Sequence, residues 1–332
     1  MKNSNGISNG VNKGFWDQLN KPIFALAPMA DVTDLAFRTI IAKYGKPPVM
    51  WTEFVSVDGL LSPGKPKLLV DLQYTEAERP IVAQIFGAKP ENFYQVAQML
   101  KAMRFDGIDI NMGCPVKKVL NQASCSALIK TPALAQEIIL AAREGGGGLP
   151  VSVKTRIGFK TNEIETWIPQ ILATKPAALI VHLRTVKEMS RVPAHWELVP
   201  EIMRIRNQES GIKGPLILGN GDVMSLAEAE QKVKDTGCDG VMLGRGIFGN
   251  PWLFSRHQPS TEEKLRVMIE HTYLFEQTFA GVKSFDVMKK HYKAYVAGFD
   301  GAKEIRTELM EQAKTAADVE RIIHKHFPKL NN

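Results

Sequence analysis

The sequence has few cysteines and no long apolar run, and both absences exclude classes of protein. Its three cysteines, Cys114, Cys125 and Cys238, cannot all pair, and no two of them form a CxxC motif. No window approaches the roughly 18 uncharged apolar residues that a membrane-spanning helix requires. We therefore expect a protein with reduced thiols, no structural disulfides, no metal site and no membrane span.

The N-terminus also lacks a feature, the apolar block of a signal peptide. Residues 1–14 are polar and rich in Asn and Gly, so we expect a flexible N-terminal arm in a cytoplasmic protein. Charge of one sign is only mildly in excess, at +7 with 42 Lys and Arg against 35 Asp and Glu. A basic balance makes a polyanionic partner such as RNA plausible.

Eight short apolar runs alternate with segments of helical periodicity. Such alternation, completed eight times, is typical of a (β/α)₈ TIM barrel. The predicted strands are 23–28, 49–54, 81–86, 107–112, 150–154, 178–182, 215–219 and 240–244, and clear helical periodicity covers 35–44, 93–103, 133–143 and 225–235.

The chain changes character after the eighth strand. Pro251–Phe254 is expected to end the last helix of the barrel, and Ser260 with the acidic residues after it is typical of a helix start. Amphipathic helical patterns alone follow. We therefore predict a TIM-barrel catalytic domain over residues 15–259 and a smaller all-helical domain over 260–332, with Gly145–Gly148 as a flexible link before the fifth strand.

The fourth predicted strand ends in the most informative motif, Asn111-Met-Gly-Cys-Pro. A free cysteine is most often a small core residue, but the Gly before Cys114 and the Pro after it indicate a rigid turn at the carboxyl end of a strand. Catalytic groups of α/β barrels lie at these ends. Cys114 is therefore the candidate reactive residue.

Polar or special residues also follow the other strands, where a packed core needs none. Leu218-Gly-Asn-Gly-Asp and Met242-Leu-Gly-Arg-Gly place glycines after strands seven and eight, where barrels commonly bind a phosphate, with Arg245 as a charge partner. Lys154 and Gln84 suit a flavin ring. A Schiff-base role for Lys154 is the alternative, although such an enzyme has no obvious need for Cys114 and both glycine loops.

These motifs, in this order, resemble those of the tRNA-dihydrouridine synthases. The resemblance runs from Ala27-Pro-Met-Ala-Asp-Val-Thr-Asp through Asn111-Met-Gly-Cys-Pro and Val153-Lys-Thr-Arg to Leu243-Gly-Arg-Gly, and the tail Met288-Lys-Lys-His-Tyr-Lys-Ala-Tyr is also similar. The chain departs from the family pattern at two places. Ala123-Ser-Cys-Ser-Ala replaces a frequent glycine-rich turn, and Leu183 stands where the family often has Gly.

The resemblance implies an FMN-containing barrel, a helical tRNA-binding domain, NADPH as reductant and Cys114 as the catalytic acid. It further implies that FMN is held by Pro28, Met29, Ala30, Gln84, Lys154, His182, Asn220, Gly221, Asp222, Gly244 and Arg245, while the substrate is met by Asn111 and Arg156. We add Arg184 and the basic pair Lys289 and Lys290 as substrate-binding candidates. The protein is expected to be monomeric.

The implied chemistry suits these residue types. Hydride delivered to C6 of uracil leaves an enolate that needs a proton at C5, and a thiol with an ordinary pKa of about 8.5 can supply it. The target uridine must leave the RNA stack to reach a barrel rim. From Ser260 onward there are twelve Lys and Arg against eleven Asp and Glu, so most of the excess positive charge lies in the barrel domain. We therefore expect RNA to contact both domains.

Two other functions stay open at this point. The chain could be an FMN barrel that reduces a small pyrimidine or enone, as dihydroorotate dehydrogenases do, although such an enzyme has little use for the helical tail. It could also be a non-catalytic RNA-binding protein on a retained barrel.

Overall fold

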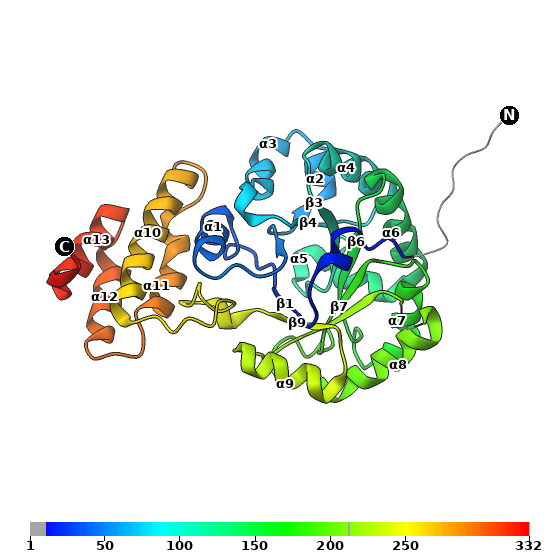
Figure 1. The fold of residues 1–332 in the computed structure, drawn as a ribbon. Helices are drawn as coiled ribbons and strands as arrows, with labels where there is room; N and C mark the ends of the chain where they lie inside the picture. The colour runs from blue at the N-terminus through cyan, green and yellow to red at the C-terminus, as the bar shows by residue number, and fades with distance from the viewer. Residues whose placement is uncertain (1–10, 212, 332) are drawn as a thin grey trace.

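A computed structural model describes residues 11–211 and 213–331. Nine parallel strands form one sheet in the order β1-β9-β8-β7-β6-β5-β4-β2, and β3 also pairs with β4. The strands are β1 Ile23–Leu26, β2 Met50–Trp51, β3 Val55–Ser56, β4 Ile81–Phe86, β5 Gly107–Met112, β6 Val151–Arg156, β7 Ala178–His182, β8 Leu216–Asn220 and β9 Gly240–Leu243. The predicted TIM barrel is confirmed, with β1 and β2 at the ends of the sheet path (Figure 1).

Helices surround this sheet and continue after it. Those of the barrel are α1 Leu35–Tyr44, α2 Val57–Leu60, α3 Lys65–Leu68, α4 Pro90–Ala102, α5 Lys117–Leu120, α6 Pro132–Gly146, α7 Ile164–Leu172, α8 Val199–Ser210 and α9 Leu226–Thr236. The tail forms α10 Thr261–Phe279, α11 Lys289–Tyr295, α12 Ala302–Gln312 and α13 Ala316–His326. None of the helices described is long and apolar enough to cross a membrane.

Alternating side chains of the strands divide the apolar core into two layers. Ile23, Ala25 and Ala27 of the first strand segment belong to the inner cluster, whereas Leu26 packs against the outer helices. Trp16 joins the inner cluster and is 2 % exposed. It lies on the short 3-10 helix η1 (Gly14–Gln18) that precedes β1. The barrel is therefore filled by side chains and is not a pore.

The second predicted strand, 49–54, is interrupted in the structure. Trp51 pairs with Val82 and Val55 pairs with Ile85, so the β2–β3 side carries one more residue than β4 between these two pairs. A bulge of this kind redirects a side chain, and here the buried Glu53 accepts a hydrogen bond from the backbone N–H of Asp31 at 2.5 Å.

The prediction of a last barrel helix that ends at Pro251–Phe254 is wrong. After β9 the chain forms the 3-10 helix η6 (Arg245–Ile247) and a series of turns, and the next α-helix among the described residues is α10. Gly249 has a positive φ of 65°, and a Cβ on it would lie 2.5 Å from the backbone of Ala294 in α11. The tail therefore packs tightly where a continuing helix would need room.

The predicted flexible link at Gly145–Gly148 is also wrong in part, because α6 includes Gly145 and Gly146. A Cβ on Gly145 would lie 2.1 Å from the carbonyl oxygen of Tyr94 in α4. The glycine therefore permits close packing of two helices. Residues 1–10, most of the expected N-terminal arm, lie outside the described residues, whereas the Asn12 side chain already donates to the Gly148 carbonyl at 2.9 Å.

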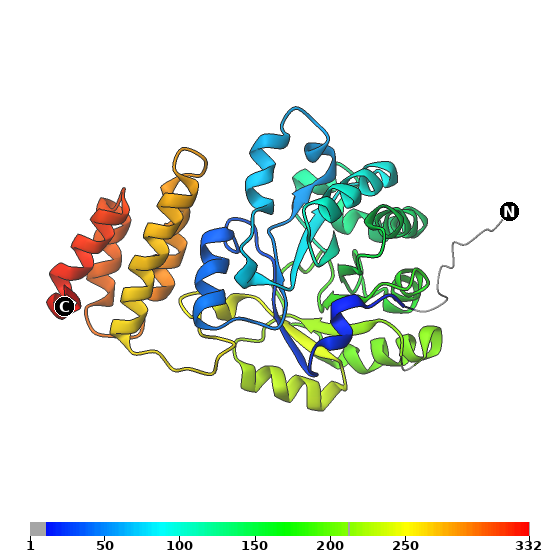
Figure 2. The same cartoon turned by 45° about the horizontal axis from the view of Figure 1, so that its top comes forward.

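The helical tail is joined to the barrel through α1 (Figures 1 and 2). Lys43 and the Tyr44 hydroxyl contact Glu270 of α10 at 2.7 and 2.6 Å. Lys283 lies 2.8 Å from Glu53 and 2.9 Å from Asp71. These contacts, together with the stacked rings of Phe37 and His271, join the tail to the barrel.

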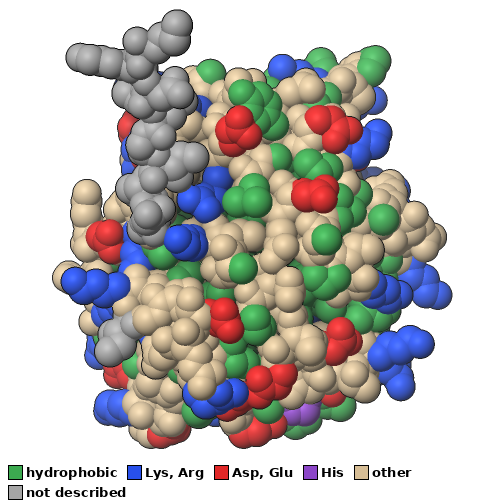
Figure 3. All heavy atoms as spheres, turned by 90° about the vertical axis from the view of Figure 1, so that its right-hand side faces the viewer, with side chains coloured by type: hydrophobic (Ala, Val, Ile, Leu, Met, Phe, Trp, Pro, Cys, Tyr) green, Lys and Arg blue, Asp and Glu red, His purple; other side chains and the backbone are tan. Residues whose placement is uncertain are grey.

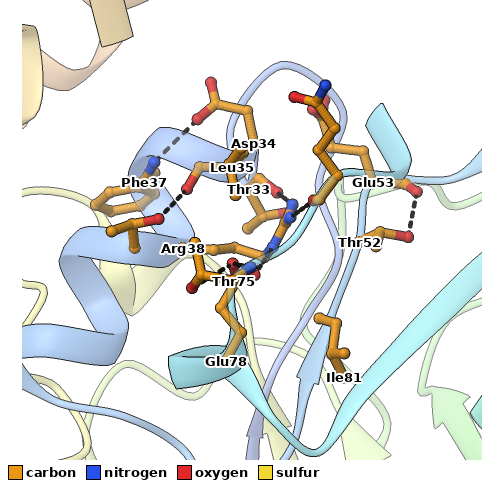
Figure 4. Close-up of polar contacts among 12 residues, drawn as sticks. Thr33, Asp34, Leu35, Phe37, Arg38, Thr52, Glu53, Thr75, Glu78 and Ile81 are labelled. Carbon is orange, nitrogen blue, oxygen red and sulfur yellow. Dashed lines mark hydrogen bonds and ion pairs between the residues drawn. The ribbon is translucent and has the colours of Figure 1, made fainter. Parts of the chain in front are cut away.

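A buried ion pair shapes the segment between β1 and α1 (Figure 4). Asp34 caps α1 by accepting from the N–H of its first turn at 2.9 Å. Arg38 donates to Glu78 at 2.6 Å, to the carbonyl of Thr33 at 2.7 Å and to that of Gln73 at 2.6 Å. Each side-chain nitrogen of Arg38 thus has a hydrogen-bond partner. These contacts fix the loop that carries Pro28 to Ala30 at the rim.

Candidate active site

The carboxyl ends of the strands bring the predicted cofactor residues together. The parallel register pairs Asn111 with Lys154, and His182 with both Arg156 and Asn220. A cavity of about 260 Å³ opens at this edge. Its lining includes nine of the eleven predicted FMN residues, namely Pro28, Met29, Lys154, His182, Asn220, Gly221, Asp222, Gly244 and Arg245.

Lys154 extends a partly buried ammonium group from β6 toward β8. Its Nζ donates to the Asn220 side-chain oxygen at 3.0 Å, and the Asn220 amide donates to the Met242 carbonyl at 2.7 Å. Burial, and next the charge of Arg156, lower the pKa of Lys154 to about 8. A cation kept in such a site favours an anionic ligand, because a negative charge beside it offsets the cost of burial.

The glycine loop after β9 leaves room for a ligand beside a cationic cluster, whereas a Cβ on Gly221, in the loop after β8, would lie 2.7 Å from the Ala194 side chain. A Cβ built on Gly244 would meet its nearest atoms, in Ala27 and Met29, at 3.9 Å, so this backbone faces open cavity space. Asp222 pairs with the exposed Arg245 at 2.6 Å and also with Arg184. An open glycine backbone beside an arginine fits a phosphate group.

His182 is neutral in this environment. Burial is the first cause that holds its pKa well below the ordinary value, and the charges of Lys154, Arg156, Arg184 and Arg245 act in the same direction. Its Nε2 lies 3.2 Å from the Arg184 guanidinium, which can only donate, so this nitrogen accepts. The imidazole thus adds a polar wall to the cavity without adding charge.

The Arg184 side chain is buried, whereas a group that binds a substrate directly needs exposed surface. Its side chain is 4 % exposed, its Nε donates to the Val192 carbonyl at 2.6 Å, and it pairs with Asp222. It therefore lines the candidate cofactor cavity and holds Asp222 by this ion pair. The predicted substrate contact of Arg184 stays a prediction with no exposed surface to support it.

Gln84 and Asn111 belong to a buried polar chain. Asp109 accepts from Ser152 at 2.5 Å and from the Gln84 amide at 2.6 Å, and the Gln84 oxygen accepts from Asn111 at 3.0 Å. Burial raises the pKa of Asp109 to about 6. Sequence reasoning missed Asp109 and Ser152, although a carboxylate inside the apolar run 107–112 was a signal that a buried polar network exists.

The Cys114 loop is the terminus of that chain. The Asn111 side-chain oxygen accepts from the backbone N–H groups of Gly113 and Cys114, both at 3.0 Å. Arg156 donates to the Gly113 carbonyl at 2.7 Å. The backbone around Cys114 is therefore held from two strands, and the predicted contacts of Asn111 and Arg156 with a substrate remain predictions.

Cys114 itself is half-buried. A hydrogen bond from the Cys125 thiol is the largest cause that lowers the pKa of Cys114, and the N–H of Val116 and the charges of Arg156 and Lys154 add to it, giving about 6. The sequence left the pKa of Cys114 open, because the groups that lower it are brought close to the sulfur only by the fold.

A second, larger pocket lies beside the Cys114 loop. It has a volume of about 510 Å³ and is formed by three rim segments, with lining residues Pro115, Val116, Lys117, Leu120, Phe159, Lys160, Val186, Lys187 and Met189. The charged side chains of this lining are all lysines. On the side of the molecule away from the helical tail, basic and acidic side chains are instead mixed (Figure 3).

The remaining predicted residues lie outside both cavities. Ala30 is exposed at the end of the β1 loop and Gln84 is fully buried, and neither lines the cofactor cavity. Lys290 donates to the Asp31 carbonyl at 2.7 Å, and Lys289 pairs with Asp286 at 2.7 Å. The basic pair therefore stands where the tail meets the barrel rim, with part of its hydrogen-bonding capacity already used.

Comparisons with known proteins agree with this geometry. The family model described as "Dihydrouridine synthase (Dus)" matches residues 25–330. The chain is 40% identical over 310 residues to "Probable tRNA-dihydrouridine synthase 2" of Bacillus subtilis (strain 168), covering 92% of this chain and 94% of that protein. It is 39% identical over 311 residues to "Probable tRNA-dihydrouridine synthase" of Staphylococcus aureus (strain COL), with the same shares covered.

Solved structures match the barrel more distantly. Morphinone reductase superimposes with a TM-score of 0.52 at 13% identity, covering 75% of this chain and 90% of that one. A similarity at this level supports the barrel fold alone.

Proposed function

The chain belongs to the dihydrouridine synthase family, and on that premise we propose that it is a flavin-dependent oxidoreductase that reduces specific uridines of tRNA to dihydrouridine. The observation that carries the proposal is the placement of a half-buried thiol and a cationic cavity on one rim of the barrel. A thiol there can donate a proton to a base whose other face is turned toward the cavity.

The cavity residues fit FMN. Gly221, Gly244 and Arg245 would hold the phosphate, and the ammonium of Lys154 would stand against the ring, where it would favour negative charge. When bound, FMN would supply hydride to C6 of uracil and would then be reduced again by NADPH. The open backbone at Gly244 and the Lys154 ammonium, which among the described residues has no acidic partner at hydrogen-bond distance, are the features that support the assignment.

Cys114 would complete the reduction by donating its proton to C5 of uracil. The sulfur would then carry the negative charge until solvent returns a proton, and Arg156 and Lys154 lie near enough to lower the cost of that charge. Arg156 also fixes the loop through the Gly113 carbonyl. These residues therefore orient the acid and stabilise the form that it takes after donating.

The lysine pocket beside Cys114 is suited to RNA that flanks the flipped uridine. Its apolar wall contains the Phe159 ring, over which the Lys130 ammonium lies at 3.7 Å, and Lys117, Lys160 and Lys187 stand at its edge. Bases stack on aromatic rings and phosphates attract lysines. We place the strand entering the active site along this pocket.

Charge reversal at the pocket is expected to weaken tRNA binding. The double variant Lys160→Glu and Lys187→Glu should lower affinity at least tenfold at moderate salt and reduce the dependence of log Kd on log salt by about 0.7 to 0.9 per lost phosphate contact. Filter binding or fluorescence anisotropy across a salt series measures both. Flavin content should stay unchanged, because neither lysine lines the FMN cavity.

The matched control is Lys213→Glu with Lys234→Glu, which makes the same change in net charge. Both lysines are exposed, and they lie near the opposite ends of the strands, in the loop before β8 and on α9. If this control weakens tRNA binding as much as the pocket variant does, total charge and not the pocket governs affinity.

Lys289 and Lys290 on α11 are expected to form a second phosphate contact. Charge reversal at both should weaken tRNA binding and leave flavin content unchanged. Because Lys290 also donates to Asp31, the single variant Lys289→Glu is the cleaner measurement. Unaltered binding of Lys289→Glu across a salt series would remove this patch from the RNA path.

The proposed function is tested by mapping dihydrouridine in tRNA from cells that lack this protein. Loss of the modification at one or more positions, restored by the native gene, is the expected result. If the purified protein reduced free uracil or an enone as efficiently as it reduces tRNA, the result would favour the small-molecule reductase instead. Protein that purifies colourless and binds tRNA without modifying it would favour a binding role.

A further inference from the structure

The turn between β1 and α1 has an unusual backbone conformation next to the candidate cofactor cavity. Asp31 has a φ of 55°, in the left-handed region that residues with a Cβ rarely adopt. The turn is closed on itself, because the Met29 carbonyl accepts from the N–H groups of Val32 and Thr33 at 3.1 and 3.0 Å. Pro28 and Met29 line the cavity. The conformation at Asp31 therefore sets where this wall of the cavity stands.

The side chain of Glu53 holds this turn from the neighbouring strand segment. One of its carboxylate oxygens accepts from the Asp31 N–H at 2.5 Å. The other accepts from the Lys283 ammonium at 2.8 Å. A single buried carboxylate thus joins a turn of the candidate cofactor cavity to a residue of the helical tail.

Lys283 is itself fixed on several sides. It lies between α10 and the 3-10 helix η7 (Phe285–Met288), and its N–H donates to the Phe279 carbonyl at 3.0 Å. Its ammonium also pairs with Asp71 at 2.9 Å and lies 4.9 Å from the centre of the Phe279 ring. The Lys283 and Glu53 side chains are only 13 % and 6 % exposed. Loss of one partner would therefore leave a poorly solvated charge on the other.

We propose that Lys283 is a positioning residue for the flavin, so that the helical tail takes part in forming the cofactor site. Lys283 keeps the Glu53 carboxylate turned toward Asp31, and Glu53 keeps the turn in the conformation that places Met29 against the cavity. The effect on FMN rests on the proposed function, whereas the link between tail and turn does not. A second tail contact, from Lys290 to the Asp31 carbonyl, is exposed, so water can replace it.

Removing the ammonium should release the turn. In Lys283→Met the Glu53 and Asp71 carboxylates lose their shared cation, and Glu53 is expected to turn toward solvent and away from Asp31. The dissociation constant of FMN, measured by flavin fluorescence as flavin-free protein is reconstituted, should rise about tenfold, the order of magnitude of one lost hydrogen bond. Amide hydrogen exchange over residues 28–33 should become faster in the flavin-free protein.

Three variants make the measurement specific. Lys43→Met breaks a different ion pair between barrel and tail, with Glu270 at the far end of α1 from the turn, and should change neither FMN affinity nor the exchange of residues 28–33. Lys283→Arg keeps the charge and should retain most of the FMN affinity. Glu53→Gln combined with Lys283→Met leaves no carboxylate at position 53 and keeps an acceptor for the Asp31 N–H. This double variant should bind FMN more tightly than Lys283→Met alone.

Two results overturn the inference. One is an FMN dissociation constant within about twofold of the native value in Lys283→Met, with unchanged exchange over residues 28–33. The other is an equal loss of affinity in Lys43→Met, because docking of the tail in general would then be responsible.

If Lys283→Met folds poorly, Glu53→Gln is measured alone. It should raise the dissociation constant of FMN about threefold, since a neutral amide accepts more weakly than a carboxylate, and an unchanged constant overturns the inference. Native protein that binds no FMN would instead overturn the proposed function. Faster exchange of residues 28–33 in Lys283→Met would even then support the link between tail and turn, because that measurement requires neither flavin nor RNA.

Discussion

Replacing Cys114 with alanine is expected to lower the rate of dihydrouridine formation by about 10² to 10⁴, the range typical for loss of a positioned general acid. The reason is that the C5 position of the reduced uracil would be left to take its proton from water. Mass spectrometry of tRNA transcripts after incubation with NADPH measures the loss. Flavin content and tRNA affinity should be unchanged, since Cys114 is not among the residues that line the candidate cofactor cavity.

The control for this experiment is Cys238→Ala. Cys238 is buried, and its thiol donates to the Gly240 carbonyl at 3.2 Å at the start of β9, the end of the strand that points away from the site. Its removal should leave the modification rate unchanged. A Cys114→Ala enzyme that keeps more than about a tenth of the native rate would mean that another group protonates C5.

Replacing Lys154 with methionine is expected to reduce both flavin retention and turnover. The variant keeps an unbranched side chain that is one atom shorter, but it removes the charge that would face the flavin, so we expect turnover to fall by about 10² to 10³ in protein that is fully loaded with FMN. Flavin absorbance after gel filtration measures retention, and tRNA modification with excess FMN separates binding from chemistry.

Stability should change little in Lys154→Met. Removing an ammonium group from a buried site is favourable, but it leaves the Asn220 side-chain oxygen without its donor. These effects oppose each other, and we expect the free energy of unfolding of the flavin-free protein to change by less than about 2 kcal/mol. Lys160→Met, in the exposed loop after the same strand, should retain flavin. Loss of flavin in both variants would show that the loop and not the ammonium is responsible.

The barrel could be predicted from the sequence because its signals are local. Apolar runs at regular intervals follow from the burial of parallel strands on both faces, and the predicted bounds of β4, β5 and β7 agree with those of the structure. The bulge after Trp51 could not be predicted, because the register depends on pairing with β4. The last barrel helix was predicted wrongly for a similar reason, because only the tertiary structure shows that the tail packs into that space.

The candidate site could likewise be predicted only in part from the sequence. Residue types and their order along the chain were enough to predict nine residues that line one cavity, since parallel strands present their carboxyl ends at one edge. Their role in holding a cofactor stays a prediction. The sequence could not separate Arg184, whose buried side chain forms part of the cavity lining, from Lys187, which is exposed and lines the pocket beside the Cys114 loop. Exposure depends on how neighbouring loops fold over each side chain.

What the sequence determined by itself was the barrel, the family and the position of the candidate acid, because each rests on a pattern of successive residues. What the tertiary structure alone decided was the environment of that acid. Cys125 reaches Cys114 only because the turn that follows Cys114 folds back on it, and the pKa of a thiol depends on atoms that are close in space and not on neighbours in the chain.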